Sequence, residues 1–498
     1  MKTLILNPDY ILKHDITRSQ ILVKETIRDD RSFGGMETFQ SFIHPIHAMI
    51  LSFFDGQKPG NEIEEASSVL GVSKESIHNF VQQITGNEAL LELEFGGQIF
   101  FFPEKTLIYT DKTIPNLRHY KATDFNYEST DFSSVRYNIP SAITFILNNV
   151  CTTDCYYCYA DRRKKVHNEI PFERIKELLH ELKESTIANV DLIGGEVFHY
   201  KHWKELLLEL KALAFTPPYL STKIPIKDDT IGFLKDIKHP DIQISLDTVI
   251  KDHLTSILKV PNSYYDSMID TFQLLEQYKM PVIVHTILSK QNSTIEDMKS
   301  MVEFLKPLGN VIKWRIDEVG HSMFLDNWQE VKPTRIQLNN VIDYLESIKK
   351  ANDLNMEIIY PEKELEIKKE LSLEERQDFF DSRSICSGNI NSMFILPDGK
   401  VSICEELYWN ERFLIGDVRQ QSITEVWNSE KAKEIFYVKQ EEVKPESACH
   451  SCKDFDKCRK FKQVCWREII RAYGEENWDY PDPNCPLAPK PLKDIGIS

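Results

Sequence analysis

The chain has 498 residues, of which 41% are hydrophobic and 28% charged, the composition of a soluble globular protein with more than one domain. Its 60 basic and 77 acidic residues give a net charge of −17, which disfavours nucleic acid and anionic membranes as partners. No apolar run is long enough to cross a bilayer, and we expect a cytoplasmic protein without a secretory signal.

The first 105 residues predict a domain of short strands and helices. β-type stretches at 10–12 and 21–24 precede three helical patterns, and two apolar strands then flank Gly96-Gly97 as a hairpin. The helical patterns cover 45–53, 60–70 and 74–84. This order is typical of a winged helix-turn-helix domain.

Winged helices often bind DNA, but the charge of this region argues against it. Residues 1–110 contain nine Lys or Arg and fifteen Asp or Glu, a net charge of −6, whereas DNA-binding domains normally carry the opposite sign. Binding of a peptide by strand addition at a sheet edge fits better. A helical cap that only packs on the rest of the chain is the structural alternative.

The middle of the chain predicts an α/β domain. Residues 106–138 are polar and predict a linker, and in 139–370 apolar β-type runs alternate with helical patterns. The runs lie at 142–147, 190–193, 219–222, 242–246, 282–287 and 311–316. Six β–α units in succession predict a parallel sheet with crossover helices, which we interpret as a partial (β/α)6 barrel of the TIM type.

The ten cysteines are unevenly distributed. None precedes Cys151, and seven fall in the last 113 residues, within a block (380–498) of little periodicity. In a reducing compartment such clusters indicate metal ligands or catalytic groups rather than disulfides. A segment without a large apolar core can be held together by metal clusters.

Three of the cysteines stand on one short loop directly after the first strand of the α/β block. Cys151, Cys155 and Cys158 form a C-x3-C-x2-C pattern. Three thiolates can bind three irons of a cubane cluster and leave the fourth iron open. Structural zinc, the alternative, requires four ligands, and no fourth Cys or His lies nearby in sequence.

This loop resembles the C-x3-C-x-aromatic-C loop of radical S-adenosylmethionine (radical SAM) enzymes, with Tyr157 as the aromatic residue. The resemblance implies that Cys151, Cys155 and Cys158 bind a 4Fe–4S cluster. It also implies that S-adenosylmethionine chelates the unique iron, that Tyr157 lies against its adenine, and that its cleavage yields a 5′-deoxyadenosyl radical.

Further residues match positions where such an enzyme would hold its cofactor. Gly194-Gly195-Glu196 follows the second strand and resembles the family's Gly-Gly-Glu segment, which binds the ammonium group of the cofactor. Four residues that end later strands could contact its ribose or carboxylate from the same barrel mouth, although an ordinary strand-end role is equally open. These are Ser221, Thr222, Ser245 and Arg315.

The last block resembles the SPASM extension of radical enzymes that modify peptides. Its pattern is C-x12-G-x4-C from Cys386 through Gly399 to Cys404, followed by the remaining cysteines. The resemblance implies two auxiliary 4Fe–4S clusters, hence three clusters in all. By order of the motif, one cluster would be held by Cys449, Cys452, Cys458 and Cys485, and the other by Cys386, Cys404 and Cys465.

Two departures from the SPASM pattern stand out. Six residues separate Cys458 from Cys465, where the family has three. Only three cysteines also remain for the second of these clusters. Either a non-cysteine group completes it or one iron is open, and an open iron could bind a thiolate of the substrate.

Together the motifs imply a maturase of ribosomally synthesised peptides. The N-terminal region would bind the leader of a precursor peptide, and an external one-electron donor such as flavodoxin or ferredoxin would supply electrons; no DNA or membrane partner is expected. A cysteine thioether of the sactipeptide or ranthipeptide type is the first choice of crosslink. The alternatives are carbon–carbon crosslinking, a sulfatase-maturating type of dehydrogenation, and a non-catalytic iron–sulfur redox regulator that uses its winged helix on DNA.

Overall fold

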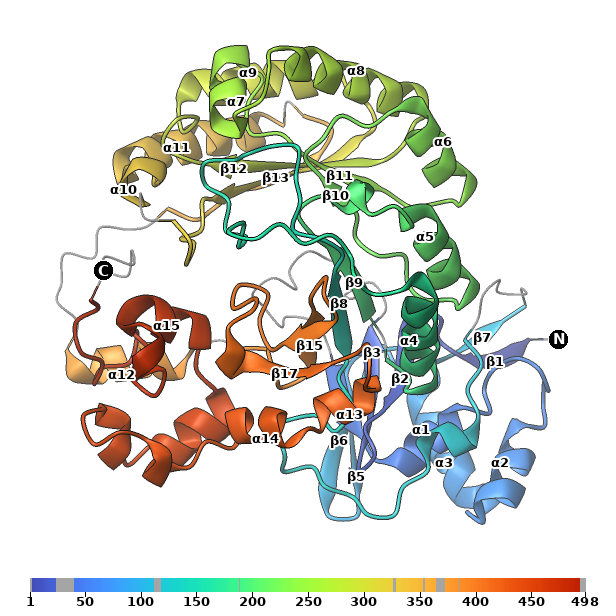
Figure 1. Cartoon of the computed structure of the whole chain (residues 1–498). Coiled ribbons are helices and arrows are strands. Elements are labelled where there is room, and N and C mark those ends of the chain that lie inside the picture. Colours follow the sequence, from blue (N-terminus) through green and yellow to red (C-terminus); the bar gives the residue numbers. More distant parts are fainter. Residues whose placement is uncertain are drawn as a thin grey trace.

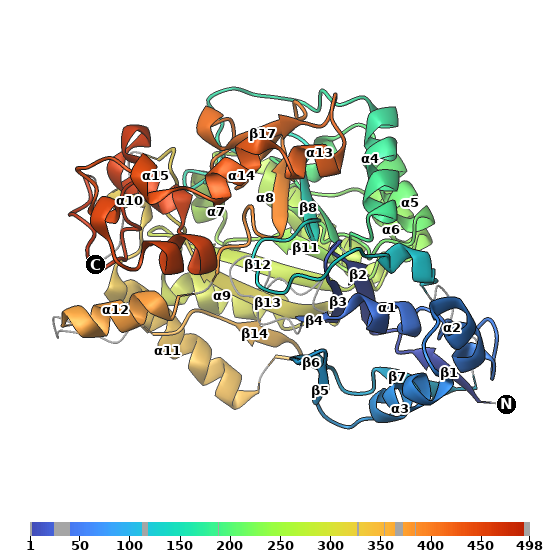
Figure 2. The ribbon, with the colours of Figure 1, turned by 90° about the horizontal axis from the view of Figure 1, so that it is seen from below.

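The computed structural model describes residues 2–23, 40–111, 118–187, 189–325, 328–352, 354–363, 372–383 and 385–492. Figure 1 shows the N-terminal elements in blue, an arc of α/β elements in green and yellow, and the C-terminal elements in orange and red. Figure 2 shows the blue and red elements at different sides of the α/β elements. None of the described helices combines the length and apolarity that crossing a membrane requires.

An antiparallel sheet forms near the N-terminus. Its order is β2-β3-β4, with Tyr10 opposite Val23 and Ser19 opposite Ile43. The strands are β2 (Tyr10–His14), β3 (Ser19–Val23) and β4 (Gln40–Ile43). The strands predicted at 10–12 and 21–24 are confirmed, except that Lys24 lies outside the described residues, and β4 has no counterpart in the sequence analysis.

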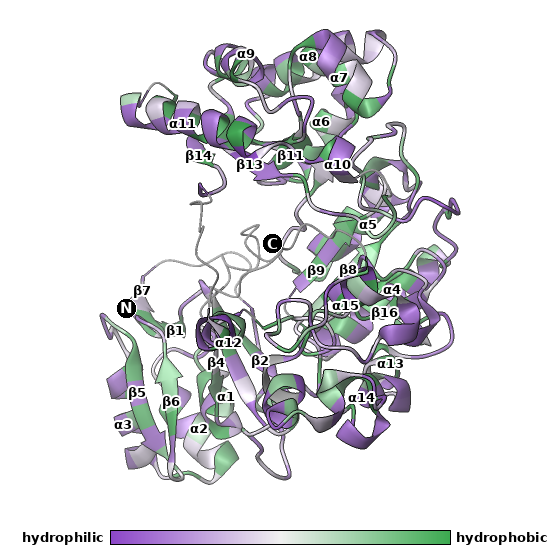
Figure 3. Ribbon diagram, turned by 90° about the vertical axis from the view of Figure 1, so that its left-hand side faces the viewer, coloured by the Kyte–Doolittle hydropathy of each residue, from purple (hydrophilic) through white to green (hydrophobic). Residues whose placement is uncertain are grey.

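Three helices and a hairpin follow, as predicted. Ser73 caps α3 by accepting a hydrogen bond from Ser76 N at 3.1 Å, and Gly71 ends α2 at a φ of +67°. Figure 3 shows the hydrophobic character of β6, whose Phe100 and Phe102 are buried in the N-terminal core. The elements are α1 (Pro45–Leu51), α2 (Glu62–Leu70), α3 (Lys74–Ile84), β5 (Leu91–Phe95) and β6 (Gln98–Phe102). The winged helix-turn-helix itself stays a prediction, because the same region also contains the β2-β3-β4 sheet.

The described residues of the segment 106–138, predicted as a linker, are packed against their neighbours. They begin with β7 (Leu107–Thr110), which runs antiparallel to β1 (Thr3–Leu6). Phe125 is fully buried in the N-terminal core, and Tyr137 is 5% exposed. A few well-placed apolar side chains anchor a segment that is polar on average, and the domain boundary at 105 stays a prediction.

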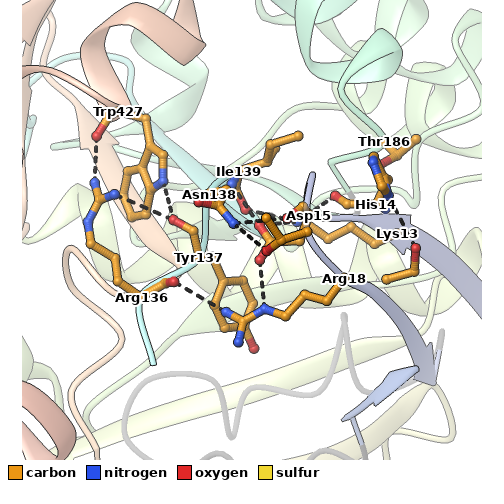
Figure 4. A network of polar contacts seen from close by, with 12 residues as sticks. Lys13, His14, Asp15, Arg18, Arg136, Tyr137, Asn138, Ile139, Thr186 and Trp427 are labelled. Carbon is orange, nitrogen blue, oxygen red and sulfur yellow. Dashed lines mark hydrogen bonds and ion pairs between the residues drawn. The ribbon is translucent and has the colours of Figure 1, made fainter. Parts of the chain in front are cut away.

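A buried charged network joins the N-terminal sheet to this segment (Figure 4). Asp15 is fully buried and accepts hydrogen bonds from Arg18 Nε at 2.9 Å and from the backbone nitrogen of Ile139 at 2.7 Å. Lys13 Nζ, also fully buried, donates to the carbonyl oxygen of Ile139 at 2.8 Å. Buried charges are retained only where such partners satisfy them, so the network fixes the sheet against residue 139.

The same network continues into the C-terminal region (Figure 4). The guanidinium of Arg136 stacks on Trp427, 4.1 Å from the ring centroid. Trp427 Nε1 donates to the carbonyl oxygen of Tyr137 at 2.8 Å, and Asn428 Nδ2 donates to that of Asn138 at 3.1 Å. The N-terminal and C-terminal regions are therefore held against the same stretch of chain.

Parallel strands and crossover helices build the centre of the molecule. All six predicted strands are confirmed, and β14 is an additional parallel strand. The strands are β8 (Ala142–Ile146), β9 (Asn189–Ile193), β10 (Ser221–Thr222), β11 (Ile242–Ser245), β12 (Val282–Leu288), β13 (Val311–Glu318) and β14 (Glu357–Ile359). The main helices are α4 (Phe172–Glu184), α5 (Trp203–Ala212), α6 (Asp228–Asp236), α7 (Lys251–Leu258), α8 (Ser263–Gln277), α9 (Ile295–Leu305) and α11 (Arg335–Ala351).

These strands form two sheets instead of the single sheet expected. One sheet has the order β10-β11-β12-β13-β14, and β8 pairs with β9 in the other. In the described part of the chain β9 and β10 do not pair. Pro217 and Pro218 precede β10, and prolines have no N–H group to donate, which leaves only the short strand Ser221–Thr222.

The C-terminal region extends the sheet of β8 and β9. β15 pairs in parallel with β8, which gives the order β17-β16-β15-β8-β9. Gly399 forms the turn between β15 and β16 at a φ of +86°. The elements are α12 (Leu373–Asp381), β15 (Ser392–Ile395), β16 (Lys400–Ser402), β17 (Leu414–Asp417), α13 (Ile423–Trp427), α14 (Glu430–Phe436) and α15 (Trp466–Tyr473).

Candidate functional site

The loop after β8 is bound to the turn after β9. Asn148 Oδ1 accepts hydrogen bonds from Val150 N at 2.9 Å and Glu196 N at 3.3 Å, and Asn148 Nδ2 donates to Glu196 O at 2.8 Å. Gly195 N donates to the carbonyl oxygen of Asn148 at 2.7 Å. The structure thus brings Gly194-Gly195-Glu196 against the residues that lead into Cys151.

The three cysteines of this loop lie close to one another in a largely buried setting. Cys155 is 8% exposed, and Cys151 and Cys158 are partly buried. Burial raises the pKa of Cys151 to about 12, and negative charge on Cys158, Glu196 and Cys155 adds to the rise. Without metal the Cys151 thiol holds its proton at neutral pH, and binding of iron would release that proton.

The loop also packs on a neighbouring helix. Tyr156 N donates to Ile257 O in α7 at 3.1 Å, and Asp154 N donates to Leu258 O at 2.9 Å. No three His, Cys, Asp or Glu side chains in the described ranges converge as they would around a single metal ion. The thiolates of a cubane cluster bind different irons, so these three neighbouring thiols fit such a cluster without meeting at one point.

Glu196 is held in place by the end of β10. Its side chain accepts hydrogen bonds from Thr222 Oγ1 at 2.9 Å, Phe198 N at 3.2 Å and Lys223 N at 3.3 Å. Glu196 is 3% exposed, and burial raises its pKa to about 7, although these hydrogen bonds oppose the rise. A buried carboxyl group with three donors is well placed to receive a cationic group.

The four strand-end residues do not all face the same side. Ser245 is opposite His285, which is opposite Arg315, so these side chains share one face of the sheet. Ser221 shares this face and accepts a hydrogen bond from Gln243 Nε2 at 2.5 Å. The following residue, Thr222, points to the other face, because side chains alternate along a strand.

Arg315 forms an ion pair with an acidic residue. Its Nε lies 2.6 Å from Asp317 Oδ2, and His285 Nε2 lies 2.8 Å from the same oxygen. Burial raises the pKa of Asp317, but the hydrogen bond from His285 and the charge of Arg315 lower it by a larger amount. The net pKa of Asp317 is therefore below its usual range.

Lys223 and Asp247, which the sequence analysis did not single out, contact Tyr157 of the cysteine loop. Tyr157, 9% exposed, donates its hydroxyl proton to Asp247 Oδ2 at 2.5 Å and accepts from Lys223 Nζ at 2.5 Å. Lys223 Nζ also lies 3.0 Å from Asp247 Oδ2. Lys223 directly follows β10 and Asp247 is the second residue after β11, so the rule that functional groups gather at strand ends could have found both.

These three residues form a charged triad, here the Tyr157–Lys223–Asp247 triad. Asp247 is fully buried, and the side chain of Lys223 is 18% exposed. Burial lowers the pKa of Lys223, but the charge of Asp247 and its hydrogen bond with the lysine act in the opposite direction, and the net pKa is above its usual range. A lysine that stays charged therefore stands beside the cysteine loop.

Four of the C-terminal cysteines surround a cavity of about 50 Å³. Two arginines donate toward their sulfurs: Arg383 Nη2 lies 3.3 Å from Cys458 Sγ, and Arg459 Nη2 lies 3.5 Å from Cys449 Sγ. Apolar side chains, including Phe380 and Phe455, form other parts of the wall. The four cysteines are Cys449, Cys452, Cys458 and Cys485.

The other three C-terminal cysteines form a separate group. Burial raises the pKa of Cys404 well above its usual range, and negative charge on Cys465 and Cys386 adds to the effect. Glu406 forms an ion pair with Arg467 through Oε1, while its buried Oε2 has no hydrogen-bond partner among the described residues. The assignment of these two groups to two separate clusters, implied by the order of the motif, stays a prediction.

Comparisons with known proteins identify two domains. A family described as the Radical SAM superfamily matches residues 145–305, and a family described as SPASM, an iron–sulfur cluster-binding domain, matches residues 386–453. The chain contains a radical SAM domain and a SPASM domain. The resemblance seen in sequence is confirmed, and with it binding of S-adenosylmethionine and iron–sulfur clusters, although the matched SPASM residues stop short of Cys458, Cys465 and Cys485.

Two proteins of Bacillus subtilis (strain 168) are similar in sequence. The sporulation killing factor maturation protein SkfB is 25% identical over 165 residues, which are 33% of this chain and 39% of SkfB. The antilisterial bacteriocin subtilosin biosynthesis protein AlbA is 22% identical over 305 residues, which are 60% of this chain and 62% of AlbA. The similarity thus spans less than two thirds of either relative.

Solved structures of SuiB from Streptococcus suis share the fold. SuiB bound to S-adenosylmethionine superposes with a TM-score of 0.61, and SuiB bound to the precursor peptide SuiA with a TM-score of 0.63. Each alignment covers 97% of this chain and 99% of SuiB at 14% identity. The radical SAM and SPASM domains, together with the N-terminal region, therefore have an arrangement known from SuiB.

Proposed function

We propose that the chain is a peptide-modifying oxidoreductase that forms a crosslink, a cysteine thioether of the sactipeptide or ranthipeptide type, in a ribosomally synthesised precursor peptide. The observation that carries the proposal is the presence of the Cys151–Cys158 loop and two further cysteine groups in one packed chain. Support comes from SkfB and AlbA, named for maturation and bacteriocin biosynthesis, and from SuiB, solved with a precursor peptide.

In the radical SAM domain, Cys151, Cys155 and Cys158 are proposed as ligands of a 4Fe–4S cluster. When bound, this cluster and S-adenosylmethionine supply a 5′-deoxyadenosyl radical that removes a hydrogen atom from the peptide. Glu196, positioned by Thr222, would receive the ammonium group of the cofactor. The close approach of Gly194 and Gly195 to the loop backbone keeps this carboxylate beside the cysteines.

Other side chains would orient the rest of the cofactor. Ser221, Ser245 and Arg315 share a face of the sheet and are proposed to contact its ribose and carboxylate. Tyr157 is proposed to lie against the adenine; its hydroxyl group is held by the triad, which leaves the ring fixed.

In the SPASM domain we propose two auxiliary 4Fe–4S clusters, and so three clusters in all. Cys449, Cys452, Cys458 and Cys485 would hold one of them within the cavity that they line. Cys386, Cys404 and Cys465 would hold the other. Either a non-cysteine group would complete this cluster or an open iron could bind a substrate thiolate.

The N-terminal region is proposed to bind the leader of the precursor as a winged helix-turn-helix recognition domain. Its negative charge favours a peptide partner over DNA. A flavodoxin or ferredoxin in the cytoplasm is the proposed electron donor. The domain ranges proposed are 1–105, 139–370 and 380–498, with 106–138 as the linker between the first two.

The proposed reaction removes two hydrogens from the peptide, which is a two-electron oxidation. The S–H bond of a cysteine and a C–H bond break, and an S–C bond forms. The hydrogen atom goes to the 5′-deoxyadenosyl radical, the thiol proton is released, and one electron leaves to an iron–sulfur cluster. Mass spectrometry of a precursor peptide treated with reduced protein should show a loss of two hydrogens per crosslink.

Alkylation of free thiols before and after the reaction separates the possible products. A thioether consumes one free thiol per crosslink, whereas a carbon–carbon bond consumes none. A sulfatase-maturating type of activity would act equally on peptides with and without a leader, and addition of the leader as a separate peptide tests this. Unchanged peptide mass with intact clusters and S-adenosylmethionine would contradict the proposal, and tight, salt-sensitive DNA binding would favour a redox regulator.

A further inference from the structure

The Tyr157–Lys223–Asp247 triad places a fixed positive charge next to the proposed cluster loop. Tyr157 is the residue before Cys158, and its hydroxyl group is bonded to both charged members of the triad. Lys223 Nζ lies 5.1 Å from the centroid of the Tyr157 ring and 2.5 Å from its hydroxyl oxygen, so the ammonium group lies at the hydroxyl end of this side chain.

The lysine has little freedom to leave this position. Its Nζ contacts Asp247 Oδ1 at 3.2 Å and Oδ2 at 3.0 Å, and its carbonyl oxygen accepts from Tyr264 OH at 2.5 Å. Asp247 is fixed in turn, because Ile287 N donates to its Oδ1 at 3.1 Å. Both the backbone and the side chain of Lys223 are therefore held, so its ammonium group has a fixed position.

We infer that Lys223 is a positioning residue whose fixed charge raises the reduction potential of the cluster held by Cys151, Cys155 and Cys158. The inference rests on the proposed assignment of these cysteines. Reduction adds negative charge to the cluster, and a nearby cation in a poorly hydrated site stabilises the reduced form. Asp247 acts with the opposite sign, because its own charge disfavours reduction. Without that charge the Tyr157 hydroxyl and Tyr264 still hold the lysine in place.

Because Lys223 and Asp247 carry opposite charges, their removal should shift the reduction potential of the cluster in opposite directions, which a merely structural role would not predict. The full-length protein is reconstituted anaerobically, and the cluster signal is followed by electron paramagnetic resonance during a redox titration. The relevant signal is the one missing from the triple variant C151A/C155A/C158A. We expect Lys223→Met to shift its midpoint potential to a more negative value, Asp247→Asn to shift it to a more positive value, and Lys223→Arg to restore the wild-type value.

Lys211 on α5 is a matched control, because its Nζ donates only to a surface carbonyl group, that of Ile237, at 2.8 Å among the hydrogen bonds described. Lys211→Met should leave the potential unchanged. Equal potentials in wild type and Lys223→Met, or shifts of the same sign in both triad variants, would overturn the inference while the proposed function stands. A wild-type protein without the signal would instead overturn the proposed function. If Lys223→Met does not fold, Lys223→Gln removes the same charge and keeps a polar group, and a potential equal to that of wild type in this variant would overturn the inference.

Discussion

Gly195 lies in direct backbone contact with Val150. A Cβ atom at Gly195 would stand 2.4 Å from Val150 N and 2.5 Å from Val150 O, closer than real Cβ atoms approach other atoms. The turn after β9 is therefore pressed onto the residue before Cys151. Two motifs that are 44 positions apart in sequence (151 and 195) share one backbone interface.

Replacement of Gly195 by alanine should separate these motifs. The added methyl group meets backbone atoms that cannot rotate away, so we expect a loss of about 1–3 kcal/mol in the free energy of unfolding of the metal-free protein. The rate of S-adenosylmethionine cleavage by the reconstituted protein should also fall at least about tenfold, since a small displacement of reacting groups is costly. Thermal melts and assays of 5′-deoxyadenosine measure both effects.

Gly232 in α6 is the control for this substitution. Its added Cβ would meet nothing closer than Tyr278 OH at 3.9 Å. Gly232→Ala should raise stability by about 0.5–1 kcal/mol, because alanine has the better helix propensity. Equal stability of the two alanine variants would contradict the role of the contact between Gly195 and Val150.

Glu196 should make the stability of the metal-free protein depend on pH. Its pKa is raised from 4.5 to about 7 in the folded state, so between these values the folded protein keeps a proton that the unfolded chain loses. Stability contributed by this group therefore falls as the pH rises from 4.5 through 7, by at most about 3 kcal/mol. Glu196→Gln removes the titrating group. In denaturant unfolding, the free energy of unfolding of this variant relative to that of wild type should be higher at pH 8 than at pH 5. A constant difference at the two pH values would contradict the assignment.

Asp15 should be essential for the junction shown in Figure 4. Asp15→Ala leaves the buried charges of Lys13 and Arg18 without their carboxylate, and such a loss typically costs about 3–5 kcal/mol. Thermal unfolding should show a large drop. Lys58→Ala, which removes an ion pair with Glu65 at 2.6 Å between a 62% and a 30% exposed side chain, should cost less than about 1 kcal/mol.

Loss of one cysteine group should remove one cluster only. With the three proposed 4Fe–4S clusters the reconstituted chain should hold about twelve irons, and Cys449→Ala should reduce this to about eight. The exposed Ser451, between Cys449 and Cys452, provides the control variant Ser451→Ala, which should keep the full amount. Iron and sulfide analysis gives the numbers, and an unchanged iron content in Cys449→Ala would contradict the assignment.

The elements of the fold could be read from the sequence to a large extent. The six predicted strands, the N-terminal helices and the hairpin at Gly96-Gly97 are all present, because β-branched runs, caps and turn residues act over a few neighbouring positions. Local sequence patterns could not predict the pairing of β15 with β8 or the packing of Phe125 and Tyr137, because each of these joins residues far apart in the chain.

The sequence by itself determined the chemistry that the chain carries: the spacing of Cys151, Cys155 and Cys158 is a property of one short stretch, and local spacing is enough to indicate an iron–sulfur loop. Only the tertiary structure decided the surroundings of that loop. Lys223 and Asp247 reach Tyr157 from the ends of two other strands, and their charges act through space on neighbours that no local pattern connects.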